Sequence, residues 1–199
     1  MYRQLYQQVI EWIPPKSRVL DLGTGDGEFL ARLVRERQVT GEGVEKNPEL
    51  VTRCIERGLV VHQGDVLDGL DQYEARSFDY VLLLGTLQEL LEPSKVMREA
   101  FRVGRFVIVS YSNFAHLRAR LQIFFTGRMP VTKNLPSPWY QTPNVHLCTL
   151  VDFEEFCRTL QARQLRTAYF NSRGRVRFWP NLRAEIGLGL LEAVNQPAA

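Results

Sequence analysis

The stretch RVLDLGTGDG at residues 18–27 decides how the rest of the chain is organised. Val19, Leu20 and Leu22 form an apolar strand run, and glycines follow at positions 23, 25 and 27. From residue 28 onward apolar residues recur at helical spacing, which predicts a helix. A strand, a glycine turn and a helix N-terminus together direct backbone N–H groups and a positive helix end at a ligand. We expect glycine here because a Cβ would block both the turn and the approach of the ligand.

The spacing of these glycines narrows the choice of ligand. A dinucleotide fingerprint requires G-x-G-x-x-G, but counted from Gly23 the third glycine position holds Glu28. No Lys-Ser/Thr pair follows the turn, which excludes a P-loop. Instead an acid, Asp21, stands in the strand end before a G-x-G-x-G turn. This pattern resembles motif I of the class I S-adenosylmethionine-dependent methyltransferases; the alternative is a plain βα turn with incidental glycines.

The resemblance implies a cofactor, S-adenosylmethionine (AdoMet) or S-adenosylhomocysteine. In that family the acid and the turn hold the amino-acid end of the cofactor, which here implies Asp21, Gly23, Gly25 and Gly27. A second strand at residues 40–45, TGEGVE, ends on an acid 24 residues after Asp21. An α/β nucleotide site places a ribose-binding carboxylate at about this distance. We therefore predict Glu45 as the ribose ligand, with a plain surface acid as the alternative.

Two later strand ends add to the predicted cofactor site. A strand at residues 59–62 leads to the sequence GDV, where the methyltransferases commonly place an acid against the adenine amino group, and Asp65 matches it. The alternative for Asp65 is an N-cap of the following turn. Residues 77–84, SFDYVLLL, read as a buried parallel strand that ends on the cleft floor. By their place in these motifs, Lys46, Val66 and Gly85 complete the predicted cofactor set.

Helical and strand patterns alternate along the chain, which predicts parallel βαβ units with a ligand beyond the strand C-termini. Expected helices lie at residues 2–13, 28–37, 48–57, 93–101 and 149–160, and further strands at 106–110, 165–170 and 186–191, although the last also fits helical spacing. Residues 171–183 receive no assignment. The resemblance implies a single α/β domain over residues 1–199, a Rossmann-like three-layer sandwich. Its seven-stranded, mostly parallel sheet would have the order 3-2-1-4-5-7-6, with the last strand antiparallel.

Residues 113–146 interrupt this alternation with a helix and a proline-rich stretch. Asn113 is a candidate cap for a helix with apolar residues at positions 114, 117, 121, 124 and 125, ended by Gly127. Four prolines then follow between residues 128 and 143, which excludes a regular helix or a central strand. Because Trp139 and Tyr140 argue against a disordered linker, we expect residues 126–146 to form an ordered lid over the cleft.

Charge is distributed unevenly along the chain. Residues 1–99 carry 17 acidic and 12 basic side chains, whereas residues 100–199 carry 5 acidic and 13 basic ones. No acid lies between Glu99 and Asp152, where the basic residues are Arg102, Arg105, Arg118, Arg120, Arg128 and Lys133. Such a segment can recruit an acidic partner or an anionic substrate, although a solvated basic face explains it equally well. Nucleic acid is not expected, because the aromatic residues here read as buried rather than as a stacking strip.

The proline-rich segment supports a closer resemblance than the superfamily. GRMPVTKNLPSPWYQTPNVHLCTLVDFEEFC, residues 127–157, is similar to the signature region of the MetW family of methionine-biosynthesis proteins. LDLGTGDGEFL, GEGVEKN, QGDVLDGL, SFDYVLLLGTLQEL and the late WPNL support the same match. The resemblance implies a protein that acts with, or regulates, homoserine O-acyltransferase (acetyltransferase). Departures such as Thr24, where cysteine is common, remove no ligand-type residue.

No catalytic signature stands out. Methyl transfer from AdoMet needs mainly alignment, plus a base if the acceptor carries a proton. Weak catalytic candidates are Gln88, Tyr140 and His146, with Asn113 and His116 as further residues expected near the cleft. His146 reads equally as a core histidine that ties down the lid, and His116 as a helix-packing residue.

Two alternative functions stay open, both enzymatic. One is an active methyltransferase acting on an unidentified small molecule or protein side chain. The other is a nicotinamide-dependent oxidoreductase, which Glu28 and the lack of a Tyr-x-x-x-Lys pair disfavour. A serine hydrolase is excluded because no G-x-S-x-G elbow exists.

Composition bounds the class of protein. No apolar run approaches the roughly 18 residues of a membrane span, and no secretory apolar region follows Met1. Cys54, Cys148 and Cys157 lack C-x-x-C spacing, which favours reduced thiols over a metal or disulfide role. We therefore expect a cytoplasmic protein with no metal and no membrane association.

Overall fold

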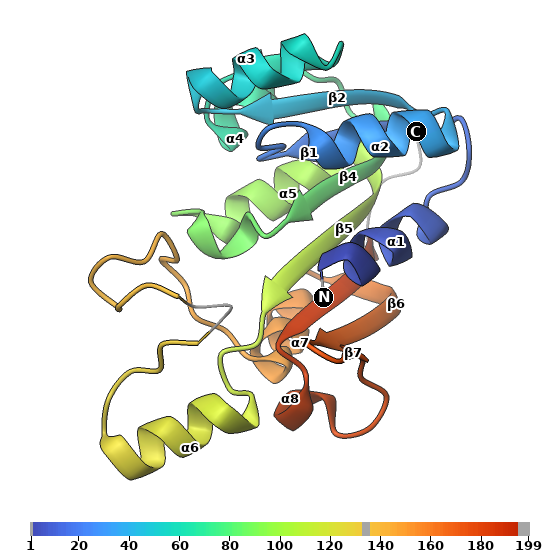
Figure 1. Ribbon diagram of the computed structural model, residues 1–199. Helices are drawn as coiled ribbons and strands as arrows, with labels where there is room; N and C mark the ends of the chain where they lie inside the picture. Colours follow the sequence, from blue (N-terminus) through green and yellow to red (C-terminus); the bar gives the residue numbers. More distant parts are fainter. Residues whose placement is uncertain (1, 133–135, 195–199) are drawn as a thin grey trace.

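An eight-stranded sheet in the order β3-β2-β1-β4-β5-β8-β6-β7 organises the fold in the computed structural model, which describes residues 2–132 and 136–194 (Figure 1). The first five strands run parallel, and β8 lies antiparallel between β5 and β6. The strands are β1 (Arg18–Leu22), β2 (Thr40–Glu45), β3 (Val60–Gln63), β4 (Phe78–Leu84), β5 (Gly104–Ser112), β6 (Ala162–Asn171), β7 (Gly174–Arg175) and β8 (Ile186–Ala193).

Helices cover both faces of this sheet and produce three layers (Figure 1). The helices of the described residues are α1 (Tyr2–Trp12), α2 (Glu28–Arg37), α3 (Pro48–Glu56), α4 (Val66–Asp71), the 3₁₀ helix η1 (Leu87–Glu89), α5 (Pro93–Val103), α6 (Leu117–Thr126), α7 (Leu150–Thr159) and α8 (Pro180–Arg183). The capping box predicted for α7 is present, because Thr149 and Asp152 exchange side-chain and backbone hydrogen bonds.

Two apolar clusters hold the layers together. On one face, α1 and α2 pack against alternate residues of the central strands, and Val19 belongs to this cluster. On the other face, α4, α5 and α7 pack against a second cluster that contains Leu20 and Leu22. Side chains of a strand alternate between the two faces, so the apolar run of β1 contributes to both clusters.

The predicted α/β class and the predominantly parallel sheet are confirmed, but the sheet has eight strands rather than seven. The order 3-2-1-4-5-7-6 is reproduced when its strand 7 is taken as β8, and the extra strand β7 pairs with the outer edge of β6. A tight turn joins β6 to β7. In this turn Asn171 Oδ1 accepts hydrogen bonds from the N–H groups of Arg173 and Gly174. The strand assignment of residues 186–191 is also confirmed, and the helical alternative is wrong.

The predicted helix after Asn113 begins later than expected. His116 is the N-cap of α6, and Asn113 instead donates from Nδ2 to the carbonyl oxygens of Asn181 and Ala184. Within α6 only Ala119 is buried. The expectation that the aromatic residues between Glu99 and Asp152 are buried is therefore wrong for Phe124 and Phe125, although it holds for Tyr111. Figure 1 shows α6 and the chain that follows it projecting from the sheet.

The remaining sequence expectations concern membrane-spanning helices, metal sites, cysteines and Lys133. Over residues 2–132 and 136–194, no helix combines the length and apolar character needed to cross a membrane. The same residues form no His, Cys, Asp or Glu group suited to a metal ion, and Cys54, Cys148 and Cys157 are free thiols. Lys133 of the basic segment lies outside the described residues.

Candidate cofactor-binding site

The glycine turn between β1 and α2 crosses the end of the neighbouring strand β2. Gly23, Gly25 and Gly27 all have left-handed backbones, with φ values of 74°, 63° and 75°. Gly23 and Thr24 donate their backbone N–H groups to the carbonyl oxygen of Val44, at 2.8 and 3.1 Å. L-residues with side chains rarely adopt this backbone region, so the turn requires glycine at these positions.

The three glycines are constrained by different neighbours. A Cβ on Gly23 would lie 2.6 Å from Thr86 Oγ1, and one on Gly27 would lie 2.5 Å from Leu59 Cδ1. A Cβ on Gly25 would meet nothing within 4 Å. The turn therefore needs Gly23 and Gly27 for packing inside the protein, in addition to any approach of a ligand.

Glu45, the last residue of β2, holds the glycine turn in place through a hydrogen bond. Its carboxylate is 8% exposed and accepts the N–H of Gly25 at 3.0 Å and that of Asn47 at 2.9 Å. Asn47 in turn caps α3 through a hydrogen bond from the N–H of Glu49. A buried carboxylate at this strand end thus joins two connections that follow adjacent parallel strands.

Asp21 lies in β1 with 3% of its surface exposed. Burial raises the pKa of its carboxyl group to about 6, and the nearby charge of Glu45 acts in the same direction. The Thr24 hydroxyl donates to Asp21 Oδ2 at 2.9 Å, which partly opposes this rise of the pKa. Asp21 therefore changes charge near neutral pH unless a cation accompanies it.

Asp21 should make the stability of the protein depend on pH between its unfolded and folded pKa values, 3.8 and about 6. The folded state binds the proton more tightly than the unfolded chain, so this contribution is complete below pH 3.8 and is lost as the pH rises through 6. The Asp21→Asn variant lacks it. We expect the free energy of unfolding of the variant, minus that of the wild type, to increase by about 2 kcal/mol from pH 4 to pH 7.

Urea unfolding of both proteins across this pH range measures the difference. Other titrating groups are present in both proteins and cancel in the subtraction. Parallel pH profiles of the two proteins would contradict the raised pKa of Asp21.

A cleft of about 640 Å³ opens at the carboxyl ends of β1, β2 and β4. Six residues of the predicted cofactor set line it: Gly23, Glu45, Lys46, Asp65, Val66 and Gly85. The other three residues of that set, Asp21, Gly25 and Gly27, are not among its lining residues. Parallel α/β sheets bind ligands at this edge, and the binding of a cofactor by these residues stays a prediction.

Asp65 is the N-cap of α4, which was the alternative interpretation of this residue. Its side chain accepts the N–H of Leu67 at 3.1 Å and so caps α4. The same residue lines the cleft. Its contact with an adenine amino group stays a prediction.

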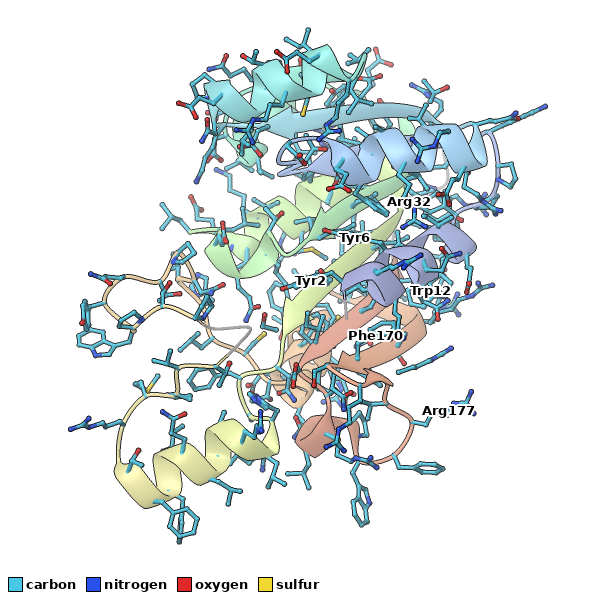
Figure 2. All side chains as sticks on the ribbon, in the orientation of Figure 1. Tyr2, Tyr6, Trp12, Arg32, Phe170 and Arg177 are labelled. Carbon is cyan, nitrogen blue, oxygen red and sulfur yellow. The ribbon has the colours of Figure 1, made fainter. Side chains whose placement is uncertain are left out.

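Sequence reasoning missed several residues of the cleft and its supports. Tyr2 and Leu91 line the cleft, and the thiol of Cys54 donates to the carbonyl oxygen of Gly25 at 3.2 Å beneath the turn. Figure 2 shows Tyr2 and Tyr6 on α1, and the Tyr6 ring stacks on Phe29 with centroids 4.6 Å apart. The only sequence signal for Tyr2 was its position on the apolar face of α1, which does not reveal a cleft.

The catalytic candidates do not line this cleft. The Gln88 amide donates to the carbonyl oxygen of Ser112 at 3.3 Å and accepts the Ser112 N–H at 2.7 Å. Tyr140 is 68% exposed and pairs edge to face with Trp139. His116 is buried beside the carbonyl oxygen of Asn113, at 3.2 Å, and Asn113 joins α8 as described above.

His146 is exposed, so the core-histidine interpretation is wrong, although the residue does attach its segment to η1. Its backbone N–H and that of Val145 both donate to the carbonyl oxygen of Gln88, at 3.0 and 2.8 Å. Its ring Nε2 lies 3.4 Å from the carbonyl oxygen of Leu91. No described residue of the expected lid, residues 126–146, lines the cleft.

Comparison with known proteins identifies the family. The model of the family described as "Methionine biosynthesis protein MetW" matches residues 3–191. The chain belongs to the MetW family. A bifunctional methionine biosynthesis protein MetXA/MetW from Rhodopirellula baltica is 33% identical over 158 residues, covering 75% of this MetW-family chain. The chain spans only about a quarter of the length of that relative.

Solved structures show that the MetW-family chain has the fold of S-adenosylmethionine-dependent methyltransferases. One such enzyme from Thermotoga maritima is 17% identical, with a TM-score of 0.69 over 96% of this chain and 89% of its own. Another from Archaeoglobus fulgidus is 14% identical, with a TM-score of 0.69 over 96% and 94%. The [4+2]-cyclase SpnF, at 16% identity, reaches 0.70 over 95% and 80%. A cyclase among these structures shows that the fold does not determine the reaction.

Proposed function

We propose that this protein binds AdoMet in the cleft and thereby acts with, or regulates, homoserine O-acyltransferase in methionine biosynthesis. The observation that carries the proposal is the buried Glu45 carboxylate, which accepts the Gly25 N–H of the glycine turn and also lines a cleft of about 640 Å³. The cleft lies where parallel α/β folds bind nucleotides.

The residues present fit AdoMet along its length. Gly85 has a left-handed backbone with φ of 86°, and a Cβ there would meet nothing within 4 Å, so this part of the floor is open to a ligand. Glu45 would accept hydrogen bonds from ribose hydroxyls, and Asp65 would contact the adenine amino group. Asp21, next to the turn, would compensate the ammonium charge at the amino-acid end. When bound, AdoMet supplies an activated methyl group on sulfur.

None of the catalytic candidates chosen from the sequence lines the cleft, and the potential bases that do line it are carboxylates such as those of Asp68, Glu89 and Glu92. The side chain of Gln88 is occupied by Ser112, and Tyr140 and His146 lie outside the cleft lining. A proton-bearing acceptor needs such a base within hydrogen-bond reach. We propose that AdoMet acts here as a signal, because AdoMet lies downstream of homoserine activation and its level reports methionine supply.

The partnership with homoserine O-acyltransferase has separate support. The Rhodopirellula relative is named for MetXA and MetW together, and this chain matches only a part of it. The MetW resemblance of the proline-rich segment implies the acyltransferase as the second component. Two functions joined in one polypeptide act at a high effective concentration, which favours a physical association in related proteins as well.

Calorimetric titration with AdoMet, with and without purified homoserine O-acyltransferase, tests the proposal. We expect AdoMet to bind the isolated protein and to bind more tightly in the presence of the acyltransferase, because linkage between two ligands is reciprocal. S-adenosylhomocysteine and NADH serve as matched ligands: the first should bind and the second should not. No AdoMet binding in either mixture would contradict the cofactor assignment.

The same samples distinguish a regulator from an active methyltransferase. AdoMet binding that ignores the acyltransferase, together with formation of S-adenosylhomocysteine when a small acid or a protein acceptor is added, would replace the regulatory proposal with an enzymatic one. AdoMet that changes neither complex formation nor the acyltransferase rate would contradict regulation alone.

A further inference from the structure

We infer that α6 carries the docking face for the partner protein, and that this partner presents an apolar pocket with an acidic rim. The inference rests on the proposed function, which supplies homoserine O-acyltransferase as the partner. The α6 face comprises four apolar and two basic residues: Leu117, Leu121, Phe124, Phe125, Arg118 and Arg128.

The apolar part of the α6 face is exposed to an unusual degree. Phe124 and Phe125 are 80% and 76% exposed and contact each other edge to face, with centroids 5.0 Å apart. Leu121 and Leu117, one and two turns earlier, are 44% and 48% exposed. Contiguous exposed apolar patches on soluble proteins mark interaction sites. Large aromatic side chains dominate the energetics of such sites.

Little inside the chain stabilises α6. It spans 10 residues, carries no side-chain cap at His116, and buries only Ala119. Helices of this length are marginal in water and draw their stability from packing of an apolar face. A partner that covers Phe124 and Phe125 would supply that packing.

The charges around the α6 face indicate an acidic partner. No Asp or Glu lies between Glu99 and Asp152. Arg118 and Arg128 are exposed, and neither forms an ion pair with any residue in the described part of the chain. Arg120 donates to the carbonyl oxygen of Ala115. Two guanidinium groups without an ion-pair partner among residues 2–132 and 136–194 lie near an aromatic pair in the sequence, which matches the arginine and aromatic enrichment of protein interfaces. They would complement carboxylates on the opposite surface.

The chain after α6 returns to the wall of the cofactor cleft. Val145 and His146 are fixed on the carbonyl oxygen of Gln88 in η1, while Thr86 and Glu89 in and beside η1 line the cleft. A smaller pocket of about 230 Å³, bordered by Gln88 and His146, lies on the other side of η1. The segment that follows α6 therefore contacts η1, which borders the cofactor cleft, and we infer that this contact gives AdoMet a route to influence partner binding.

Surface-immobilised homoserine O-acyltransferase and three variants of the chain test the inference. We expect the Phe124→Ala/Phe125→Ala double variant to bind at least about tenfold more weakly, with most of the effect in the dissociation rate. The Arg118→Glu/Arg128→Glu variant should associate more slowly, and salt should affect its association less than that of the wild type. Ile55→Ala is the matched control, because Ile55 is 61% exposed on α3 at the far end of the sheet (Figure 1).

Each outcome of this comparison is decisive. Weaker binding of the α6 variants with unchanged Ile55→Ala binding and unchanged melting temperatures supports the docking face. Wild-type affinity in the double phenylalanine variant, or equal losses in it and the control, overturns the docking face and leaves the proposed function standing. Failure of the wild type to bind the acyltransferase overturns both proposals.

Two other occupants of the α6 face are tested alongside. Sedimentation of the free chain measures self-association. A second copy of the chain would be the occupant if the wild type self-associates, the double variant does not, and the double variant still binds the acyltransferase. Flotation with vesicles of 30% anionic lipid would show a membrane surface as the occupant if the wild type floats with the vesicles, the double variant does not, and acyltransferase binding persists in the double variant. Either result overturns the protein partner at this face.

Discussion

The Gly23→Val variant is expected to lose measurable AdoMet binding and to be less stable by about 2–5 kcal/mol. Valine would have to adopt the left-handed backbone of Gly23, with φ of 74°, which is strained for a β-branched residue. Its Cβ would also lie 2.6 Å from Thr86 Oγ1, which donates to the carbonyl oxygen of Leu22 at 2.9 Å. Urea unfolding and calorimetric titration with AdoMet measure the two effects.

Gly58→Val separates the two causes in this prediction. Gly58 has nearly the same backbone, with φ of 76°, but a Cβ there would meet nothing within 4 Å, and Gly58 is not among the cleft residues. This control should lose stability from backbone strain alone and should retain AdoMet affinity. A folded Gly23→Val protein with wild-type affinity would contradict the placement of the cofactor at the turn.

Glu45→Ala is expected to weaken AdoMet binding by about 1–3 kcal/mol, roughly 5- to 150-fold. The substitution removes the proposed ribose ligand, and it also leaves the N–H groups of Gly25 and Asn47 without their acceptor. Stability should therefore fall together with affinity. Titration calorimetry gives the affinity, and thermal unfolding gives the stability.

A ligand that lacks one ribose hydroxyl distinguishes the two roles of Glu45, which are the proposed contact with the ribose and the support of the glycine turn. The wild type should bind S-adenosylhomocysteine more tightly than its 2′-deoxy analogue, and Glu45→Ala should bind the two equally. Glu49→Ala, which removes an exposed carboxylate from the first turn of α3, is the control and should keep the wild-type preference. A preference for the hydroxyl that survives in Glu45→Ala would place the ribose elsewhere.

The sequence predicts the cofactor side of the molecule well because its signals there are local. The alternation of strand, glycine turn and helix depends on neighbouring residues, and Glu45 follows from the spacing of two strand ends. The reason for Gly23, in contrast, lies 63 residues away at Thr86, and that contact exists only after β4 pairs with β1. Periodicity carries no information about such a neighbour.

The outer part of the molecule was harder to predict for a related reason. Helical spacing correctly indicated a helix around residues 117–126. The spacing of its apolar residues does not reveal whether the same chain or another molecule covers them. Asn113 has the side chain of a helix cap, yet its amide binds the chain near α8. The two-residue strand β7 is too short for any period-2 pattern, and it arises from the turn at Asn171.

The central position of β8 has a consequence for the order in which the protein can be completed during synthesis. Strands β1 to β5, with the glycine turn, come from one continuous stretch of chain, residues 18–112, and can pair as they leave the ribosome. Helix α1 is translated earlier still, but its apolar residues share a cluster with Phe170 of β6 and Leu188 of β8. The first helix therefore finds its full packing only after the last strand has been made. Because α1 brings Tyr2 to the cleft, the cofactor site would be completed only after β8 has been translated.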